Sequence, residues 1–493
     1  MKTAWMAMLV TLSCSAAAGA GPKVVELPGK SPLVTIRLVF LTGAAYDPAD
    51  KPGVAALTAA MLARGGTRSM SYKQIVDALF PMAAQVSEQT DKEMTVFSGT
   101  SHIDNLEAYY KIFREMLLDP GWRKEDFERL RDDAVNYLRV TLRGNNDEEL
   151  GKEALYNQIY AGHPYGHENH GTASALGKTT IADLQAFYRA QFTQGNLIIG
   201  LAGGYPEGFP DRVKADFAKL PAGPPAALRL PEPQPARGIR ITMIEKDTRS
   251  VAYSIGFPID VKRGDPDYPA LLAAQCYFGQ HRVSGGRLFE RMRQARGLNY
   301  GDYAYIEYFP RGMMRFEPDP NLARRRQIFQ IWIRPVEPPT AQFALRLALF
   351  EFDKLVKDGL SEEAFERTRT YLTKYVNLLT KTADAKLGYA IDSQYYGIGD
   401  YNGYLKSSLA KLTREDVNRA IRKHLVTDGM DIVVVAKNCA ALKSKLLSGE
   451  PSPMTYNSPK PPEVLNEDKI VERWTIDLKP EAVRIAPVET VFE

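Results

Sequence analysis

The histidines are the first candidates for chemistry, because imidazole can bind a metal or transfer a proton near neutral pH. They cluster once, in the run HPYGHENH that contains His163, His167 and His170. His163 and His167 have the i,i+4 spacing that could share a metal on a helix, but Pro164 and Gly166 disfavour a helix there. We therefore predict a solvated or backbone-bonded loop, with a zinc site as the weaker alternative.

Arg293 and Tyr300 form a second candidate pair. A guanidinium and a phenol can both donate hydrogen bonds to an oxygen that carries negative charge. The spacing alone does not assign this role. Arg287, Arg291 and Arg296 lie close by, so Arg293 could be an ordinary surface arginine and Tyr300 a buried strand residue.

Other catalytic and nucleotide-binding patterns are absent or weak. The glycines from Gly200 to Gly204 follow an apolar run but lack the G-x-G-x-x-G spacing, and neither a G-x-S-x-G elbow nor a P-loop occurs. Cys276 and Cys439 have no identifiable histidine partner and resemble small buried hydrophobic residues. A disulfide between them is allowed but not implied.

A helix is predicted over residues 53–67. Val54, Leu57 and Met61 recur at helical spacing, and Gly65 ends the periodic run. Residues four apart on such a helix face the same way, so this element could present a pair of side chains to one ligand.

This stretch resembles the metal-binding helix of pitrilysin-like and mitochondrial-processing-peptidase-like (inverzincin) metallopeptidases. There a Gly-Leu-Ala start and a Gly-Thr exit frame H-x-x-E-H, whose histidines hold zinc and whose Glu reaches the bound water. Gly53-Val54-Ala55 and Gly66-Thr67 give the same frame here, but the motif positions fall on Ala56, Ala59 and Ala60. Alanine has neither a lone pair nor a proton to offer.

The family's third zinc ligand is a Glu on a later helix, which the resemblance places around Asn136 to Arg139. No acid occurs in that stretch. Asp132 and Asp133 lie about one turn earlier, so a shifted alignment could supply one carboxylate but not two histidines. We therefore expect no metal in this chain.

The run from Gly285 to Tyr300 resembles the second-half signature of the same family, in which a small residue and Arg-Leu-Phe begin a helix that leads to Arg, three residues and Gly-Leu-x-Tyr. The resemblance places Arg293 and Tyr300 on the Arg and Tyr that point across the cleft to the zinc site in active members. It implies that they bind the scissile carbonyl and stabilise the oxyanion.

Two halves repeat one order of elements. Residues 124–129 are matched by 362–367 at the start of a long helix, and residues 180–183 are matched by 413–416 as capping boxes. Strands and helices mix without strict βαβ alternation. We predict an α+β fold with two homologous halves, each an antiparallel sheet with helices packed on one side.

A proline-rich linker separates the two halves, because proline at this density favours extended chain. The C-terminal region is also proline-rich and is expected to pack as an arm on its own body or on a partner. The expected segments are a signal peptide (1–20), a first peptidase-like domain without the zinc motif (21–220), the linker (221–238), a second domain with the Arg/Tyr signature (239–445) and the arm (446–493).

The N-terminal residues are typical of a signal peptide. Lys2 precedes the apolar run Ala4 to Leu12, and Ala18-Gly19-Ala20 fits the cleavage rule. We predict a periplasmic or secreted bacterial protein. A lipid anchor on Cys14 is the less favoured alternative, because Thr11 stands where a lipobox has Leu. The net charge of +4, from 63 basic and 59 acidic residues, gives no reason to expect nucleic acid or an anionic membrane as partner.

The leading hypothesis is a non-metal-binding subunit of a heterodimeric zinc metalloendopeptidase, inactive alone. A homologous subunit with H-x-x-E-H would hold the zinc, and this chain would supply Arg293, Tyr300 and half of a chamber for unfolded peptides. Two alternatives stay open. One is a non-enzymatic peptide-binding or scaffold protein of the same fold, and the other is a lone zinc peptidase with a relocated metal site.

Overall fold

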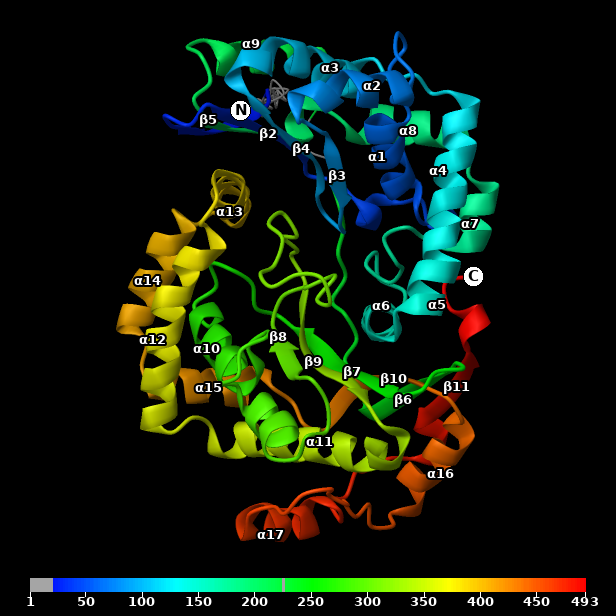
Figure 1. The fold of residues 1–493 in the computed structure, drawn as a ribbon, viewed down its shortest axis with the longest axis vertical. Helices are drawn as coiled ribbons and strands as arrows, with labels where there is room; N and C mark the ends of the chain where they lie inside the picture. Colours follow the sequence, from blue (N-terminus) through cyan, green and yellow to red (C-terminus); the bar gives the residue numbers. More distant parts are fainter. Residues whose placement is uncertain (1–20, 224–226) are drawn as a thin grey trace, which may run out of the picture.

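Two β-sheets, one from each half of the sequence, organise the protein (Figure 1). The computed structural model describes residues 21–223 and 227–493, so the predicted signal peptide, with Cys14, lies outside the described residues. Helices pack on both sheets, which confirms the predicted α+β class with two similarly built halves. Within the described ranges, no helix has the length and apolar character needed to cross a membrane.

The first sheet has the strand order β1-β5-β2-β4-β3. Its central strand β2, with the sequence LVTIRLVF, is rich in β-branched and apolar residues and pairs antiparallel with β4 and β5. Strand β1 pairs parallel with β5, so the sheet is mixed rather than antiparallel throughout. The strands are β1 (Lys23–Pro28), β2 (Leu33–Phe40), β3 (Ser87–Thr90), β4 (Thr95–His102) and β5 (Leu197–Gly203).

The second sheet has the order β11-β6-β10-β7-β9-β8. Here β7 pairs antiparallel with β10 and β9, and β8 with β9, whereas β6 runs parallel to both β10 and β11. This sheet is therefore mixed as well. The strands are β6 (Gly238–Glu245), β7 (Val251–Ile259), β8 (Asp302–Tyr305), β9 (Gln327–Val336), β10 (Gly429–Ala436) and β11 (Val483–Pro487).

The α-helices divide between the two halves of the sequence. Those of the first half are α1 (Val54–Arg64), α2 (Tyr72–Leu79), α3 (Leu106–Leu118), α4 (Lys124–Asn136), α5 (Arg143–Asn145), α6 (Asp147–Ile159), α7 (Ala173–Lys178), α8 (Ile181–Gln191) and α9 (Phe209–Phe217). Those of the second half are α10 (Tyr268–Gly279), α11 (Ala341–Asp358), α12 (Glu362–Leu379), α13 (Ala383–Tyr396), α14 (Tyr401–Lys411), α15 (Arg414–His424), α16 (Cys439–Ser448) and α17 (Pro462–Val471).

The two predicted capping boxes are confirmed. The hydroxyl of Thr180 accepts from the N–H of Asp183 at 3.3 Å, and the N–H of Thr180 donates to the Asp183 carboxylate at 2.9 Å, where α8 begins. Thr413 and Asp416 make the same two bonds, each 3.1 Å long, where α15 begins. Each box provides partners for backbone groups that a helix start otherwise leaves unpaired.

One helix of each half packs against the sheet of the other half. Helix α6 packs against β7 and β10, where Gly151 lies against Val435. In return, α13 packs against β1, β2 and β5, where Leu387 and Ile391 lie against Gly200. Helices therefore cover both faces of each sheet rather than the single face predicted, because a helix distant in sequence closes the second face.

The C-terminal residues pack on the body of the chain, which is the first of the two alternatives predicted for the arm. Helix α17 lies against α11, and β11 extends the second sheet beyond β6. The chain then reaches the first half, where the Ala173 N–H donates to the Phe492 carbonyl at 3.0 Å and Arg143 pairs with the Glu493 carboxylate at 2.7 Å.

Candidate functional site

The helix predicted over residues 53–67 is α1, and it begins and ends close to the predicted positions. The carboxylate of Asp47 accepts hydrogen bonds from the N–H groups of Gly53 and Ala55, each at 2.7 Å, and so caps the helix start. At the other end, the N–H of Gly65 donates to the carbonyl of Met61 at 2.9 Å.

Ala56, Ala59 and Ala60 lie on α1 at the spacing of H-x-x-E-H. The side chains of Ala59 and Ala60 are buried in the apolar core of the first half. Methyl groups cannot bind a cation, and zinc takes its ligands from Cys, His, Asp and Glu. The residues of this helix therefore do not fit a zinc ion.

Tyr137 lies where the resemblance places the third ligand. It begins the π-helical turn η4 (Tyr137–Leu142), which follows α4 directly. Its ring packs on the imidazole of His170, with 4.3 Å between the ring centroids, and His170 in turn pairs with Glu168 at 3.2 Å. Burial raises the pKa of the Tyr137 phenol well above its usual range, so this side chain stays neutral.

The two acids that a shifted alignment could supply are exposed and already paired. Asp132 lies 2.9 Å from Arg131, and Asp133 lies 3.8 Å from Arg129. Neither carboxylate could bind a metal together with α1, because α1 carries no histidine.

The histidine run forms a loop in which each imidazole has a separate partner. The Nδ1 atom of His163 accepts from the N–H of Tyr165 at 3.0 Å, and burial lowers the pKa of His163 to about 4. His167 pairs with Asp47, the residue that caps α1, at 3.1 Å. Within residues 21–223 and 227–493, no three or more His, Cys, Asp or Glu side chains are grouped so that they could hold a metal.

Cys276 and Cys439 are both buried and free, so they do not form a disulfide. Burial raises the pKa of the Cys439 thiol to about 12, which leaves it protonated near neutral pH. Neither residue has the thiolate character of a nucleophile.

Arg293 and Tyr300 lie together in the second half. Arg293 belongs to the π-helical turn η6 (Phe289–Gln294), and its Nη1 atom donates to the backbone carbonyl of Tyr300 at 2.8 Å. The guanidinium lies over two rings, 5.0 Å from the centroid of Phe289 and 5.4 Å from that of Tyr300. Tyr300 is 73% exposed, so it is not the buried strand residue of the alternative interpretation.

The neighbouring arginines Arg287, Arg291 and Arg296 all form ion pairs with carboxylates. Their ion pairs are Arg287–Glu351 at 2.7 Å, Arg291–Glu351 at 3.0 Å, Arg296–Glu467 at 2.8 Å, Arg296–Asp468 at 2.8 Å and Arg291–Glu467. In the part of the chain that the structure describes, Arg293 makes no ion pair with a carboxylate. Its surroundings therefore differ from those of an ordinary structural arginine.

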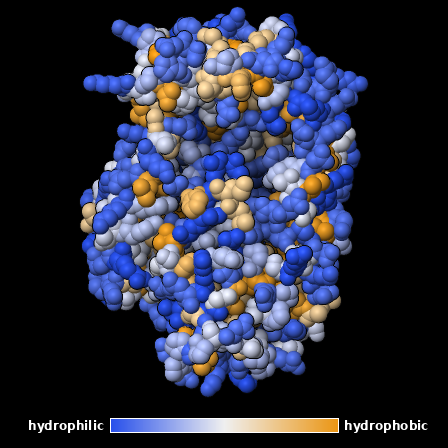
Figure 2. Space-filling model, viewed as in Figure 1, coloured by the Kyte–Doolittle hydropathy of each residue, from blue (hydrophilic) through white to orange (hydrophobic). Residues whose placement is uncertain are grey.

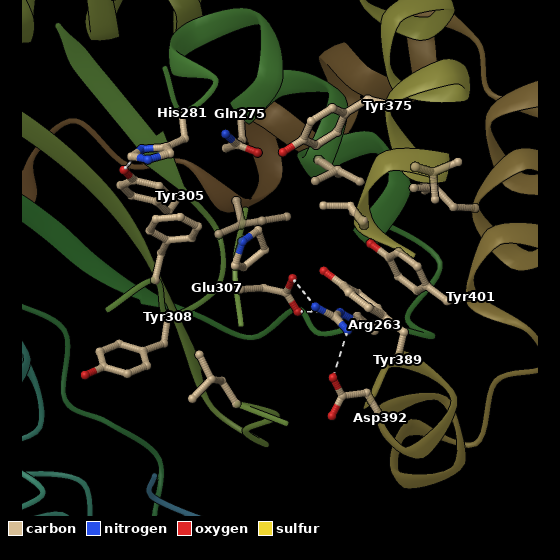
Figure 3. A pocket seen from close by; sticks show the side chains of 18 of the residues that line it. Arg263, Gln275, His281, Tyr305, Glu307, Tyr308, Tyr375, Tyr389, Asp392 and Tyr401 are labelled. Carbon is tan, nitrogen blue, oxygen red and sulfur yellow. Dashed lines mark hydrogen bonds and ion pairs between the residues drawn. The ribbon is translucent and has the colours of Figure 1, made fainter. Parts of the chain in front are cut away.

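A cavity of about 90 Å³ lies among α10, α12, α13, α14 and the chain that follows β8 (Figure 3). Arg263 on its wall pairs with Glu307 at 2.8 and 3.1 Å and with Asp392 at 3.5 Å, and the Tyr268 hydroxyl donates to Glu307 at 3.0 Å. These three charged groups therefore pair with one another at the cavity wall. Its polar residues come from separate segments, and no local sequence pattern could have identified them.

The chain between β8 and β9 extends into the space between the two lobes, and the face in Figure 2 is hollowed there and mostly hydrophilic. Near its end, Arg324 pairs with Asp91 at 2.5 Å, and Arg325 pairs with Glu93 at 2.6 Å. Asp91 and Glu93 belong to the β3–β4 turn of the first half. This segment therefore joins the two halves through ion pairs that the sequence could not indicate.

Sequence comparison relates the chain to two family descriptions. Residues 24–173 match "Insulinase (Peptidase family M16)", and residues 178–372 match "Peptidase M16 inactive domain". An uncharacterized zinc protease of Mycobacterium tuberculosis is 24% identical over 306 residues, which are 59% of this chain and 68% of that protein.

Two further relatives extend this similarity. A probable mitochondrial-processing peptidase subunit beta of Arabidopsis thaliana is 22% identical over 258 residues, which are 51% of this chain and 48% of that protein. The solved structure of a peptidase M16 inactive domain from Pseudomonas fluorescens superposes with a TM-score of 0.71 at 25% identity. That superposition covers 85% of this chain and 96% of the other.

Proposed function

Because this chain belongs to the peptidase M16 family, we propose that it is the non-metal-binding subunit of a heterodimeric zinc peptidase. The observation that carries the proposal is the contrast between two positions. The helix of the metal motif presents Ala56, Ala59 and Ala60, whereas Arg293 and Tyr300 lie together, exposed and without a carboxylate partner within the described residues.

The chemistry assigned to the pair is carbonyl binding. The guanidinium of Arg293 and the hydroxyl of Tyr300 are hydrogen-bond donors that can meet the oxygen of a scissile peptide bond as its negative charge grows. Each such donor stabilises the transition state by about 3–4 kcal/mol. The packing of the Arg293 guanidinium over the Tyr300 ring keeps the two side chains close together.

The partner in this proposal is a homologous subunit with H-x-x-E-H, which would bind the zinc, and the substrate would be an unfolded peptide held between the two chains. The similarity to a protein named as one subunit of a processing peptidase supports this arrangement. The predicted signal peptide supports a periplasmic or secreted location, with a lipid anchor on Cys14 as the alternative.

The first experiment measures metal and activity in the mature chain alone. We expect substoichiometric zinc and no cleavage of fluorescein-labelled casein, because α1 provides no ligand. A content of about one zinc per chain would instead favour a lone peptidase with a relocated metal site.

The second experiment uses the partner recovered by affinity copurification with this chain. We expect casein cleavage by the complex, and Arg293→Ala or Tyr300→Phe should each lower kcat by roughly 100- to 1000-fold. Arg189→Ala, which removes an exposed arginine of α8, is the matched control. Full activity in both site variants would contradict the assigned roles, and recovery of an assembly without an H-x-x-E-H subunit would favour the scaffold alternative.

A further inference from the structure

The C-terminal arm contacts the segment that carries Arg293. Helix α17 packs beside α11 and brings Glu467 and Asp468 against the arginines of that segment. Asp468 is buried, and the hydroxyl of Tyr456, also in the arm, donates to its carboxylate at 2.6 Å.

Arg296 is the centre of this contact, and its side chain is 0% exposed. Its Nε atom donates to Asp468 and its Nη2 atom to Glu467, each at 2.8 Å, while Nη1 donates to the backbone carbonyl of Arg291 at 3.0 Å. One guanidinium thus joins the arm to the backbone of the π-helical turn two residues before Arg293.

Arg291 provides the second connection, because it pairs with Glu467 of the arm and with Glu351 of α11. The carboxylate of Glu351 is almost fully buried and also receives Arg287. Arg293 therefore lies between two arginines that are each fixed by acids, one on either side in the sequence.

Such a buried network is a poor source of net stability. Removing charges from water is costly, and their mutual attraction only roughly offsets that cost. Such a network does restrict geometry, because a guanidinium held by more than one acceptor has a preferred orientation. π-helical turns, moreover, occur frequently at functional sites.

We propose that Glu467 and Asp468 are positioning residues for Arg293. They hold the π-helical turn η6 from the side of the arm, so that the Arg293 guanidinium stays beside Tyr300 and directed at the substrate carbonyl. The catalytic part of this inference rests on the proposed function, whereas the structural part concerns this chain alone.

Hydrogen exchange of the full mature chain tests the structural part without any partner. The N–H of Gly297 donates to the Arg293 carbonyl at 2.8 Å and that of Leu298 to the Met292 carbonyl at 3.1 Å, so these amides report on the turn. We expect Glu467→Gln to cause loss of protection in peptides covering 289–300. Glu463→Gln, an exposed acid on the same helix, should leave protection unchanged.

Unchanged exchange in Glu467→Gln would overturn the proposal. If that variant loses protection in β2 as well, it has unfolded globally, and Tyr456→Phe replaces it, because this change removes only the hydroxyl that supports Asp468. The same peptides are then decisive: local loss of protection supports the proposal and unchanged protection overturns it.

Activity of the complex tests the catalytic part. We expect Glu467→Gln to lower kcat roughly 10- to 100-fold with little change in KM, because a small displacement of a catalytic group reduces the rate without removing binding. In an Arg293→Ala background the same substitution should have no further effect, since its action passes through Arg293.

The outcomes separate the two proposals. An equal loss of kcat with and without Arg293 would overturn the positioning role, because a general structural effect adds to that of Arg293→Ala. If Arg293→Ala alone leaves kcat unchanged, the proposed function fails, and hydrogen exchange still decides whether the arm fixes the turn.

Discussion

A guanidinium without a carboxylate partner keeps most of its hydrogen-bond donors available for a ligand. One nitrogen of Arg293 donates to the Tyr300 carbonyl at 2.8 Å, and no carboxylate among the described residues pairs with the rest. Arg287, Arg291 and Arg296 have the same side chain in the same segment, but their acids fix them as structural residues.

Arg293→Lys tests whether catalysis needs the planar guanidinium, with its fixed set of donors, or only a positive charge. An ammonium cannot contact the Tyr300 carbonyl and a substrate oxygen with the same fixed geometry, so we expect kcat of the complex to fall at least roughly tenfold. Steady-state kinetics on labelled casein measure this. Wild-type kcat in the lysine variant would mean that charge alone suffices.

His281 makes stability depend on pH. It is buried, its Nε2 atom donates to the Arg315 carbonyl at 2.9 Å, and its Nδ1 atom accepts from the Tyr305 hydroxyl at 2.8 Å. Burial lowers the pKa of His281 to about 4, below the value of about 6.5 in the unfolded chain. The unfolded chain therefore binds the proton first, and folding stability is lost as pH falls from about 6.5 to about 4.

We expect this histidine to account for about 2 kcal/mol of that loss between pH 7 and pH 5. Urea unfolding at pH 7 and pH 5 measures it, and His281→Gln should reduce the difference between the two pH values. His102→Gln, a change at a half-exposed histidine, is the control. An unchanged pH difference in His281→Gln would refute the assignment.

At the scale of elements, α1 is a helix that packs into the apolar core of the first half. Asp47 caps the start of this helix, and Gly65 ends it. The positions at the spacing of the metal motif carry only methyl groups, and those of Ala59 and Ala60 are buried in the core. Tyr137, at the position that the resemblance gives to the third ligand, packs instead on the ring of His170.

Introducing H-x-x-E-H into α1 tests how tightly these alanine positions are packed. Ala56→His, Ala59→Glu and Ala60→His together enlarge side chains on a partly closed face, and overpacking costs about 1–3 kcal/mol per site. We expect a lower Tm and no stoichiometric zinc, because Tyr137 supplies no ligand. Metal analysis and thermal melting check both expectations. Tight zinc binding by this triple variant would show that the site needs no carboxylate as a third protein ligand.

The elements that the sequence predicted are those that local rules determine. The helix α1 and the capping boxes at Thr180 and Thr413 follow from spacing and from side chains three residues apart. The parallel pairing of β1 with β5 and the π-helical turns at Tyr137 and Arg293 depend on distant packing. Local propensity cannot indicate them.

The candidate site follows the same rule. Arg293 and Tyr300 lie seven residues apart, so a sequence signature could propose them together. The acids that hold their segment lie in α11 and α17, between about 50 and 180 residues further along the chain. Only the folded chain shows that Glu467 and Asp468 contact this segment.

At the scale of the whole molecule, ion pairs join the two halves. Arg324 is 1% exposed and Asp91 is 0% exposed, so Arg324→Leu would leave a buried carboxylate without its partner. We expect a loss of about 3–5 kcal/mol in the free energy of unfolding, measured by urea denaturation. Arg326→Leu, whose acids Glu232 and Asp260 are exposed, should cost less than about 1 kcal/mol. An equal loss in the free energy of unfolding for the two variants would contradict the claim that burial of the ion pair determines the cost.

The exchange of α6 and α13 between the two sheets has a consequence for movement. Each half is closed by a helix of the other, and glycines at 151 and 200 allow those helices to approach the strands closely. Among the residues that the structure describes, the two lobes therefore cannot swing apart without unpacking α6 or α13 from the opposite sheet. If two such chains enclose a peptide, the gate through which it enters has to open along the seam between the subunits.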